Sequence, residues 1–295
     1  MKRIIILITI IYLNIFAVYE IAVFDSQIAG MGEAVGAVNV GNSFVINPAN
    51  LNFNDKMIFS FKTSIGNISL VDSFEMAGTL FSRFLINKNF GIGAFLDYDL
   101  FTYSGGFVRI AGSSLWSEKK IGVSMTYKFN NMFRLGMLIK TFSFSSDAIV
   151  ETIDFKTKYS FDTDVGLLFV FKKIQLGLSI NNLVSLNNYT ERKMRLGSVF
   201  KIGEFISILK DNSFAADFEY ILGSNKLNIY LGDEYIFSNI ITFRIGLNSQ
   251  GIIDNIKPSL GMTYKLKNIS FSYSAIFNFI ISSLGEHNIS IDYRL

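Results

Sequence analysis

The residues of this chain that could support catalysis are few and lie far apart in the sequence. His287 is the only histidine, and cysteine is absent. The absence of cysteine excludes a thiol nucleophile, a Cys-ligated metal and a disulfide framework. His287 has the side chain of a general base, but the next residue on the same strand face is Ile289, so no serine nucleophile follows it there. We interpret His287 as a residue at the rim of the fold and expect no enzymatic activity.

Two further groups have residue types that bind ions or nucleotides. Asp162 and Asp164 share one face of a strand, where paired carboxylates could hold a cation, but no further acidic partner is visible and we expect both to be solvated. Gly91-Ile92-Gly93 lacks the later glycine and the helix of a dinucleotide-binding loop. We therefore expect no metal and no cofactor.

The charge distribution gives no indication of a nucleic-acid partner. Lysine and arginine total 27 against 24 aspartates and glutamates. The basic residues are scattered singly, without the run or stripe that follows a phosphate backbone. Nucleic acid is excluded as an expected partner.

The composition favours a chain in contact with lipid. Half of the residues are hydrophobic, only 17% are charged, and the mean hydropathy is +0.36, which is high for a soluble domain. Only two prolines occur among 295 residues, as expected if most of the chain forms paired strands. After Phe24 no apolar run approaches the roughly 20 residues that a transmembrane helix needs.

The N-terminus has the pattern of a secretory signal. Lys2 and Arg3 precede an uncharged apolar stretch over residues 4–18. We expect a signal peptide over residues 1–17, with cleavage after Ala17, although Ile15 is a poor match to a small-residue cleavage site. An N-terminal anchor helix remains the alternative.

The rest of the chain alternates between apolar and polar residues with a period of two. In residues 119–130, Ile121, Val123 and Met125 share one face, and Ser124 lies on the other. Fourteen such segments are predicted strands: 57–65, 74–84, 88–98, 117–129, 132–144, 158–171, 173–182, 193–202, 213–221, 226–236, 241–248, 257–266, 269–277 and 286–295. A fifteenth is possible near residues 105–112.

Alternation is also typical of a soluble sandwich, but three features favour a membrane barrel. The leader indicates export, many strands reach the 9–11 residues that cross lipid, and aromatic residues lie near strand ends. Tight links alternate with longer ones, which places both termini in the periplasm. We predict an all-β fold: a transmembrane antiparallel up-and-down β-barrel of about 14 strands over residues 57–295.

A barrel of this size has an interior too wide for its own wall side chains to fill. The segment before the first strand, residues 18–56, mixes small apolar residues with few charges. We predict that it is an N-terminal lumen plug, with residues 29–51 inside the barrel.

Two motifs in this segment resemble a known family. Gly30-Met31-Gly32 is followed by Asn47-Pro48-Ala49, and the chain ends in Gly285-Glu286-His287-Asn288-Ile289-Ser290-Ile291-Asp292-Tyr293-Arg294-Leu295. The pattern is similar to the PorV/PorQ branch of the FadL long-chain fatty-acid transporter superfamily. The resemblance implies a plug or hatch motif formed by Gly30, Met31, Gly32, Asn47, Pro48 and Ala49. Val40-Gly41-Asn42 stands where the family usually has an acidic pair, so an acidic contact is not carried over.

The motif residues can also be interpreted from their own chemistry, without the resemblance. Asn47 before Pro48 can cap a helix whose first residue is proline, or it can belong to an ordinary turn. Gly30 and Gly32 can allow close approach of the plug to the wall, or they can simply be flexible.

Two functions remain open at this point. The resemblance implies either passage of hydrophobic small molecules across the bacterial outer membrane, or docking of exported protein cargo. The expected partners are outer-membrane lipid, one of these two ligands, and the barrel-assembly machinery during biogenesis.

Overall fold

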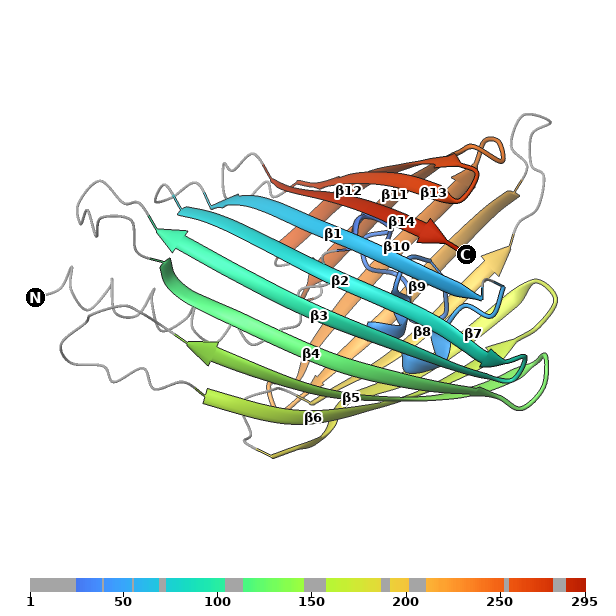
Figure 1. Ribbon diagram of the computed structural model, residues 1–295, viewed down its shortest axis with the longest axis horizontal. Helices are drawn as coiled ribbons and strands as arrows, with labels where there is room; N and C mark the ends of the chain where they lie inside the picture. Colours follow the sequence, from blue (N-terminus) through green and yellow to red (C-terminus); the bar gives the residue numbers. More distant parts are fainter. Residues whose placement is uncertain are drawn as a thin grey trace, which may run out of the picture.

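The structure is a computed structural model. Over the residues that it describes, the chain forms a closed barrel of fourteen antiparallel strands (Figure 1). These residues are 25–38, 40–54, 56–68, 73–103, 114–145, 158–186, 192–201, 211–251, 255–277 and 285–295. Each strand pairs with its sequence neighbours, and β1 pairs with β14 to close the ring. The predicted barrel and its strand number are confirmed. The possible strand near residues 105–112 lies outside the described residues.

The strands are β1 (Met57–Ile68), β2 (Ser73–Asn87), β3 (Phe90–Tyr103), β4 (Ser114–Lys128), β5 (Phe133–Ser145), β6 (Lys158–Val170), β7 (Ile174–Ser185), β8 (Arg192–Lys201), β9 (Asp211–Leu222), β10 (Lys226–Ile236), β11 (Ile241–Gln250), β12 (Asn255–Leu266), β13 (Ile269–Ile276) and β14 (Glu286–Arg294).

The period of two separates the two faces of the wall as predicted. On β4, Ile121, Val123 and Met125 are 52%, 39% and 44% exposed, whereas Ser124 is fully buried. The apolar parity therefore points outward and the polar parity points into the lumen. An outward apolar surface on a ring without open edges is the arrangement that lipid requires, because every backbone group finds a partner within the wall.

Most of the short connections lie at the end of the barrel where β1 begins and β14 ends. Residues 88–89, 171–173 and 267–268 are such links. Four connections break this pattern: residues 69–72, 223–225 and 251–254 are short links at the opposite end, and residues 202–210 are a longer one at the short-turn end. The predicted asymmetry therefore holds for most connections.

The segment before β1 lies inside the barrel toward its short-turn end (Figure 1, blue). We call residues 25–51 the plug. It contains α2 (Ser26–Gly30) and two short 3₁₀ helices, η1 (Ser43–Val45) and η2 (Pro48–Asn50). None of the described helices is long and apolar enough to cross a membrane. The prediction that residues 29–51 lie within the barrel is confirmed for the residues described.

The core of the molecule is the contact between the plug and the wall. Plug side chains such as Ile28, Met31 and Phe44 are almost completely buried and form one apolar cluster with wall residues including Phe81 and Leu138. The interior of this barrel is thus packed at the height of the plug, as the interior width required.

Candidate functional site

The start of the plug is bound to the wall by a buried cluster of charges where β1 meets β14. The Lys62 Nζ lies 3.1 Å from a carboxylate oxygen of Asp25 and 2.9 Å from one of Asp292. The Gln27 side chain donates a hydrogen bond of 2.7 Å to Asp292. Asp25 also caps α2 by accepting from the Gln27 N–H and accepts from the Asn42 N–H. One plug carboxylate therefore ties two parts of the plug to the first strand of the barrel.

The middle of the plug meets a second buried charge cluster on β8 and β9. Arg195 forms an ion pair with Glu219 at 3.0 Å and donates to the Glu33 carbonyl oxygen at 3.1 Å. Asp217 accepts a 2.6 Å hydrogen bond from the Gly36 N–H and lies 3.7 Å from Arg195. The wall thus contacts the plug backbone with both a donor and an acceptor at this point.

Glu33 occupies an unusual position in this cluster. Its φ is +64°, in the left-handed region that residues with a side chain rarely adopt. Desolvation in the lumen raises the pKa of the Glu33 carboxyl, and the nearby Arg195 opposes that shift. The environment therefore favours the neutral form of this side chain more than water does.

The end of the plug is held by the Asn47 motif. Asn47 accepts from the Ala49 N–H at 3.0 Å, with Pro48 at the first position of η2, so the predicted cap is present. The same side chain donates to the carbonyls of Gly36 at 2.7 Å and Leu167 at 3.2 Å. Asn47 therefore joins two distant turns of the plug to each other and to β6.

Glycines on eight strands of the wall face the plug. A methyl group added at any of them would approach the plug closely. We call this set the glycine belt: Gly91, Gly136, Gly166, Gly177, Gly197, Gly232, Gly246 and Gly261, on strands β3, β5, β6, β7, β8, β10, β11 and β12. Several belt members are direct cross-strand partners, including Gly136 with Gly166, Gly177 with Gly197, and Gly232 with Gly246.

The predicted motif residues of the plug lie against this belt. Gly30 approaches Gly261, and Met31 and Gly32 approach Gly232 and Gly246. Gly30 and Gly32 therefore do allow close approach of the plug to the wall, as one of the two interpretations predicted. Gly32 also has a φ of +58°. Asn47, Pro48 and Ala49 meet the wall at Gly136 and Gly166. The structure places both motifs at the contact between plug and wall.

An aromatic group forms one border of the plug. The Phe44 ring packs edge-on against Phe81 of β2 at 6.1 Å between centroids, and Phe81 lies 6.1 Å from Phe95 of β3. Phe95 covers the space above Gly122 of β4. This is an apolar area in a lumen wall that elsewhere carries many buried polar side chains.

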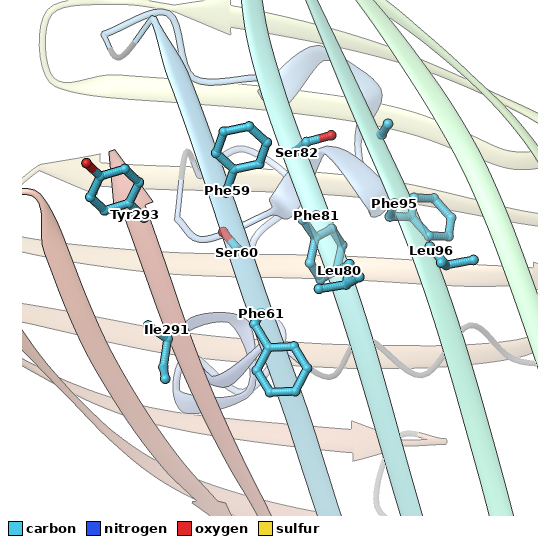
Figure 2. A pocket seen from close by; sticks show the side chains of 11 residues that line it. Phe59, Ser60, Phe61, Leu80, Phe81, Ser82, Phe95, Leu96, Ile291 and Tyr293 are labelled. Carbon is cyan, nitrogen blue, oxygen red and sulfur yellow. The ribbon is translucent and has the colours of Figure 1, made fainter. Parts of the chain in front are cut away.

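The outer face of the same strands carries a hollow of about 550 Å³ (Figure 2). Its rim consists of exposed apolar side chains, and Ser82 and Ala94, a cross-strand pair, leave the space between them. The rim residues are Phe59, Phe61, Leu80, Leu96, Ile291 and Tyr293. Phe81 and Phe95 of the aromatic group also line this hollow.

The remaining candidates from the sequence have structural roles. Asp162 and Asp164 point into the lumen but are fully buried, and Asp164 forms an ion pair with Lys140 at 2.7 Å, so the expectation that both are solvated is wrong. The cause is that inward side chains here pair with one another instead of facing open water. His287 contacts the Tyr273 hydroxyl at 2.7 Å at the start of β14. Among the described residues, no group of three His, Cys, Asp or Glu side chains is arranged to hold a metal ion.

Sequence reasoning missed the charge clusters and the glycine belt. Lys62, Arg195 and Asp292 stand on inward positions of predicted strands, so their direction was predictable from parity. The contacts that define the clusters were not, because Arg195 meets the Glu33 carbonyl 162 residues away and Lys62 meets Asp292 230 residues away. The wall glycines also have inward parity in eight different strands. That recurrence was the signal available for the belt.

No family model matches the sequence, and no curated protein matches it. Solved structures do match its fold. The Pseudomonas putida toluene transporter TodX superposes with a TM-score of 0.67 at 12% identity, covering 92% of this chain and 97% of that one. The Ralstonia pickettii toluene transporter TbuX gives 0.64 at 13%, covering 92% and 97%. A Pseudomonas aeruginosa FadL homologue gives 0.59 at 13%, covering 91% and 98%. The plugged fourteen-strand barrel thus has the fold of the FadL-type outer-membrane transporters.

Proposed function

We propose that this protein is an outer-membrane channel through which hydrophobic small molecules pass. The observation that carries the proposal is the architecture itself: a fourteen-strand barrel with an N-terminal plug, matching toluene transporters over almost its whole length. Fold alone does not define a ligand. The interior must therefore supply a suitable surface.

The aromatic group at the edge of the plug supports an apolar ligand. Phe44, Phe81 and Phe95 pack against one another where the plug meets β2 and β3, and all three are buried, so a ligand would reach them by displacing part of the plug. The neighbouring cations are occupied by carboxylates, as Lys62 and Lys140 are. Binding sites for small apolar molecules are lined mainly by hydrophobic and aromatic side chains. A hydrocarbon that leaves water is stabilised most where it contacts apolar side chains such as these.

Uptake measurements test the proposal. Cells of a host without a toluene uptake protein would express the chain, and entry of labelled toluene and of a labelled fatty acid would be compared with entry of a sugar. We expect faster entry of at least one hydrophobic compound and unchanged entry of the sugar. Equal rates for all compounds with and without a correctly inserted barrel would overturn the proposal.

A matched pair of variants sharpens this test. Phe81→Ser changes an inward ring of the aromatic group, whereas Phe61→Ser changes an exposed outward ring on the neighbouring strand. Uptake should fall in the first variant and persist in the second, provided that both are inserted in equal amounts.

A second candidate is docking of an exported protein, which the resemblance of Gly30-Met31-Gly32 and Asn47-Pro48-Ala49 to the PorV/PorQ branch favours. Under that function, the barrel would show no uptake of hydrophobic compounds. It would instead retain one exported protein of the same organism in stoichiometric amount after purification in detergent. The uptake assay and this stoichiometry together separate the two candidates.

The proposed location is the bacterial outer membrane, with both termini in the periplasm and with residues 1–17 removed as a signal peptide. Assembly there would involve the barrel-assembly machinery. We expect the protein to need detergent for extraction and to migrate differently in gels before and after heating, because a closed barrel resists detergent until heated. Extraction by carbonate alone would contradict the location, and N-terminal sequencing of the mature protein would locate the cut.

A further inference from the structure

We propose that the glycine belt is the seat that sets the position of the plug, and that a single methyl group on it opens a leak for ions. This inference deepens the proposed function, because it names the wall residues that keep the closed barrel impermeable. It rests on the plug acting as the barrier. It does not depend on which hydrophobic compound the barrel takes.

The backbone of the wall does not itself require glycine at the belt. Among the described glycines, a left-handed φ occurs at Gly32, Gly41, Gly223, Gly251 and Gly285, and none of these belongs to the belt. Extended strand backbone accepts any side chain, and glycine within a strand costs stability. The need for glycine at the belt therefore comes from what faces it.

The plug faces most of the belt with main-chain atoms. A methyl group on Gly136 would overlap the carbonyl carbon of Pro48, and one on Gly177 would overlap the carbonyl oxygen of Gly36. A methyl group on Gly246 would overlap the backbone nitrogen of Gly32. A flexible side chain could rotate away from such a methyl group, but a backbone atom moves only if that part of the plug moves.

Hydrogen bonds beside the belt also end on the plug main chain. Thr126, the cross-strand partner of Gly136, donates to the Pro48 carbonyl at 2.6 Å. Arg195 on β8 donates to the Glu33 carbonyl at 3.1 Å, and Arg134 on β5 donates to the Leu51 carbonyl at 3.2 Å. These bonds are short and directional. A plug displaced by the width of a methyl group would lose both the van der Waals fit and these bonds.

The belt has members of graded severity, which gives the proposal internal controls. The methyl group on Gly91 would meet only side-chain atoms of Leu51 and Leu85 as its two nearest contacts. Gly261 is intermediate, because its methyl group would lie 2.9 Å from the Gly30 Cα. Gly78 on β2 is the matched control, since its methyl group would meet nothing closer than the Lys62 carbonyl at 4.0 Å.

The test is ion conductance of the full chain in planar lipid bilayers, with no hydrophobic compound present. We expect Gly136→Ala, Gly177→Ala and Gly246→Ala each to raise the conductance several-fold, Gly261→Ala and Gly91→Ala to raise it less, and Gly78→Ala to leave it unchanged. Unchanged conductance of heat-modifiable Gly136→Ala, Gly177→Ala and Gly246→Ala barrels would overturn the proposal, as would an equal rise in Gly78→Ala.

Two further measurements accompany the conductance test. If a severe variant does not insert, Gly261→Ala demands a smaller displacement and decides the question alone: a conductance equal to that of the unmodified barrel overturns the proposal. Protease cleavage within residues 25–51, added from the short-turn side, should accelerate in step with conductance. The result is also distinct from that of the uptake assay, because a barrel that takes up no toluene can still leak ions when its seat is altered.

Discussion

The two faces of the barrel wall follow the same alternation but are specified in different ways. The outward face repeats large apolar side chains from strand to strand, as Phe61, Leu80 and Leu96 do in adjacent strands, each about half exposed. The inward face places a particular residue at each position. Lys62 lies between two carboxylates and Gly136 lies against the Pro48 backbone.

The difference follows from what each face contacts. Lipid is a fluid that adapts to any apolar shape, so the outer face needs only hydrophobicity and length. The plug is a folded polypeptide with fixed polar groups, and buried polar groups must each find a partner. We therefore expect substitutions to act on the outer face through polarity and on the inner face through geometry and pairing.

The largest effect is expected at Lys62, on the inner face. Lys62→Met leaves Asp25 and Asp292 buried without their cation, and loss of one partner of a buried pair costs about 3–5 kcal/mol. Urea unfolding of the refolded barrel in lipid measures the free energy of unfolding. A variant that also carries Asp25→Asn and Asp292→Asn should recover much of the loss. Equal stability of Lys62→Met and the unmodified protein would show that the cluster does not bind the plug.

Val123→Arg is the matching change on the outer face. An arginine at mid-bilayer on the lipid face of a barrel costs about 2–4 kcal/mol, while Val123→Leu should be neutral. The same urea titration applies. A cost for Val123→Leu as large as that for arginine would mean that this face is packed as specifically as the lumen.

The neighbouring Ser124 lies on the inner face of the same strand. Parity predicts that Ser124 faces the lumen, which is confirmed, and that arginine is therefore tolerated there. Ser124 is completely buried, however, and its cross-strand partner Gly93 lies against Phe44 of the plug. We expect Ser124→Arg to leave membrane insertion intact but to displace the plug, which protease access to residues 25–51 would detect.

A smaller effect is expected at Asn47. Asn47→Ala removes the cap on the Ala49 N–H and the bonds to two carbonyls, and loss of a cap typically costs about 0.5–2 kcal/mol. Asn52→Ala is the control, because Asn52 accepts from the Asn54 N–H in an exposed turn outside the packed plug. Faster proteolysis of the plug in Asn47→Ala alone is the expected result, and identical rates in both variants would contradict it.

The smallest effect is expected at Glu33 and depends on pH. Because desolvation raises the Glu33 pKa above 4.5 in the folded protein, its contribution to stability is fully present below pH 4.5 and decreases as the pH rises through the raised pKa. Glu33→Gln should therefore flatten the pH dependence of the unfolding midpoint, and the gain relative to the unmodified protein should grow from acid to neutral pH. A constant difference between the two proteins over that range would exclude this titration.

The sequence was sufficient to predict the wall because each strand carries its own signal. Alternation such as Ile121, Val123 and Met125 is local, and it gives both the strand and its outward face without knowledge of any neighbour. Boundaries were less certain at the long-loop end, where β1 and β3 extend beyond the predicted residues. At that end the strands continue past the last residues at which apolar and polar side chains alternate regularly.

The candidate site could be located from the sequence but not assembled from it. The Asn47-Pro48 cap is local and was predictable, because a capping side chain acts on a backbone group two residues away. The pairing of Arg195 with the Glu33 carbonyl joins residues 162 positions apart. Neither periodicity nor spacing indicates which inward residue of β8 would meet which turn of the plug.

The charge cluster around Lys62 also has a consequence for the order of folding. Lys62 belongs to the first strand and Asp292 to the last, so their contact spans the seam at which the barrel closes. The Ser26 N–H bonds to Ser290 across 264 residues of chain. Contacts of such separation carry the largest loop-closure entropy and form late. The first part of the plug can therefore settle only after the final strand is in place, and the seam and the plug complete the molecule in one concluding step.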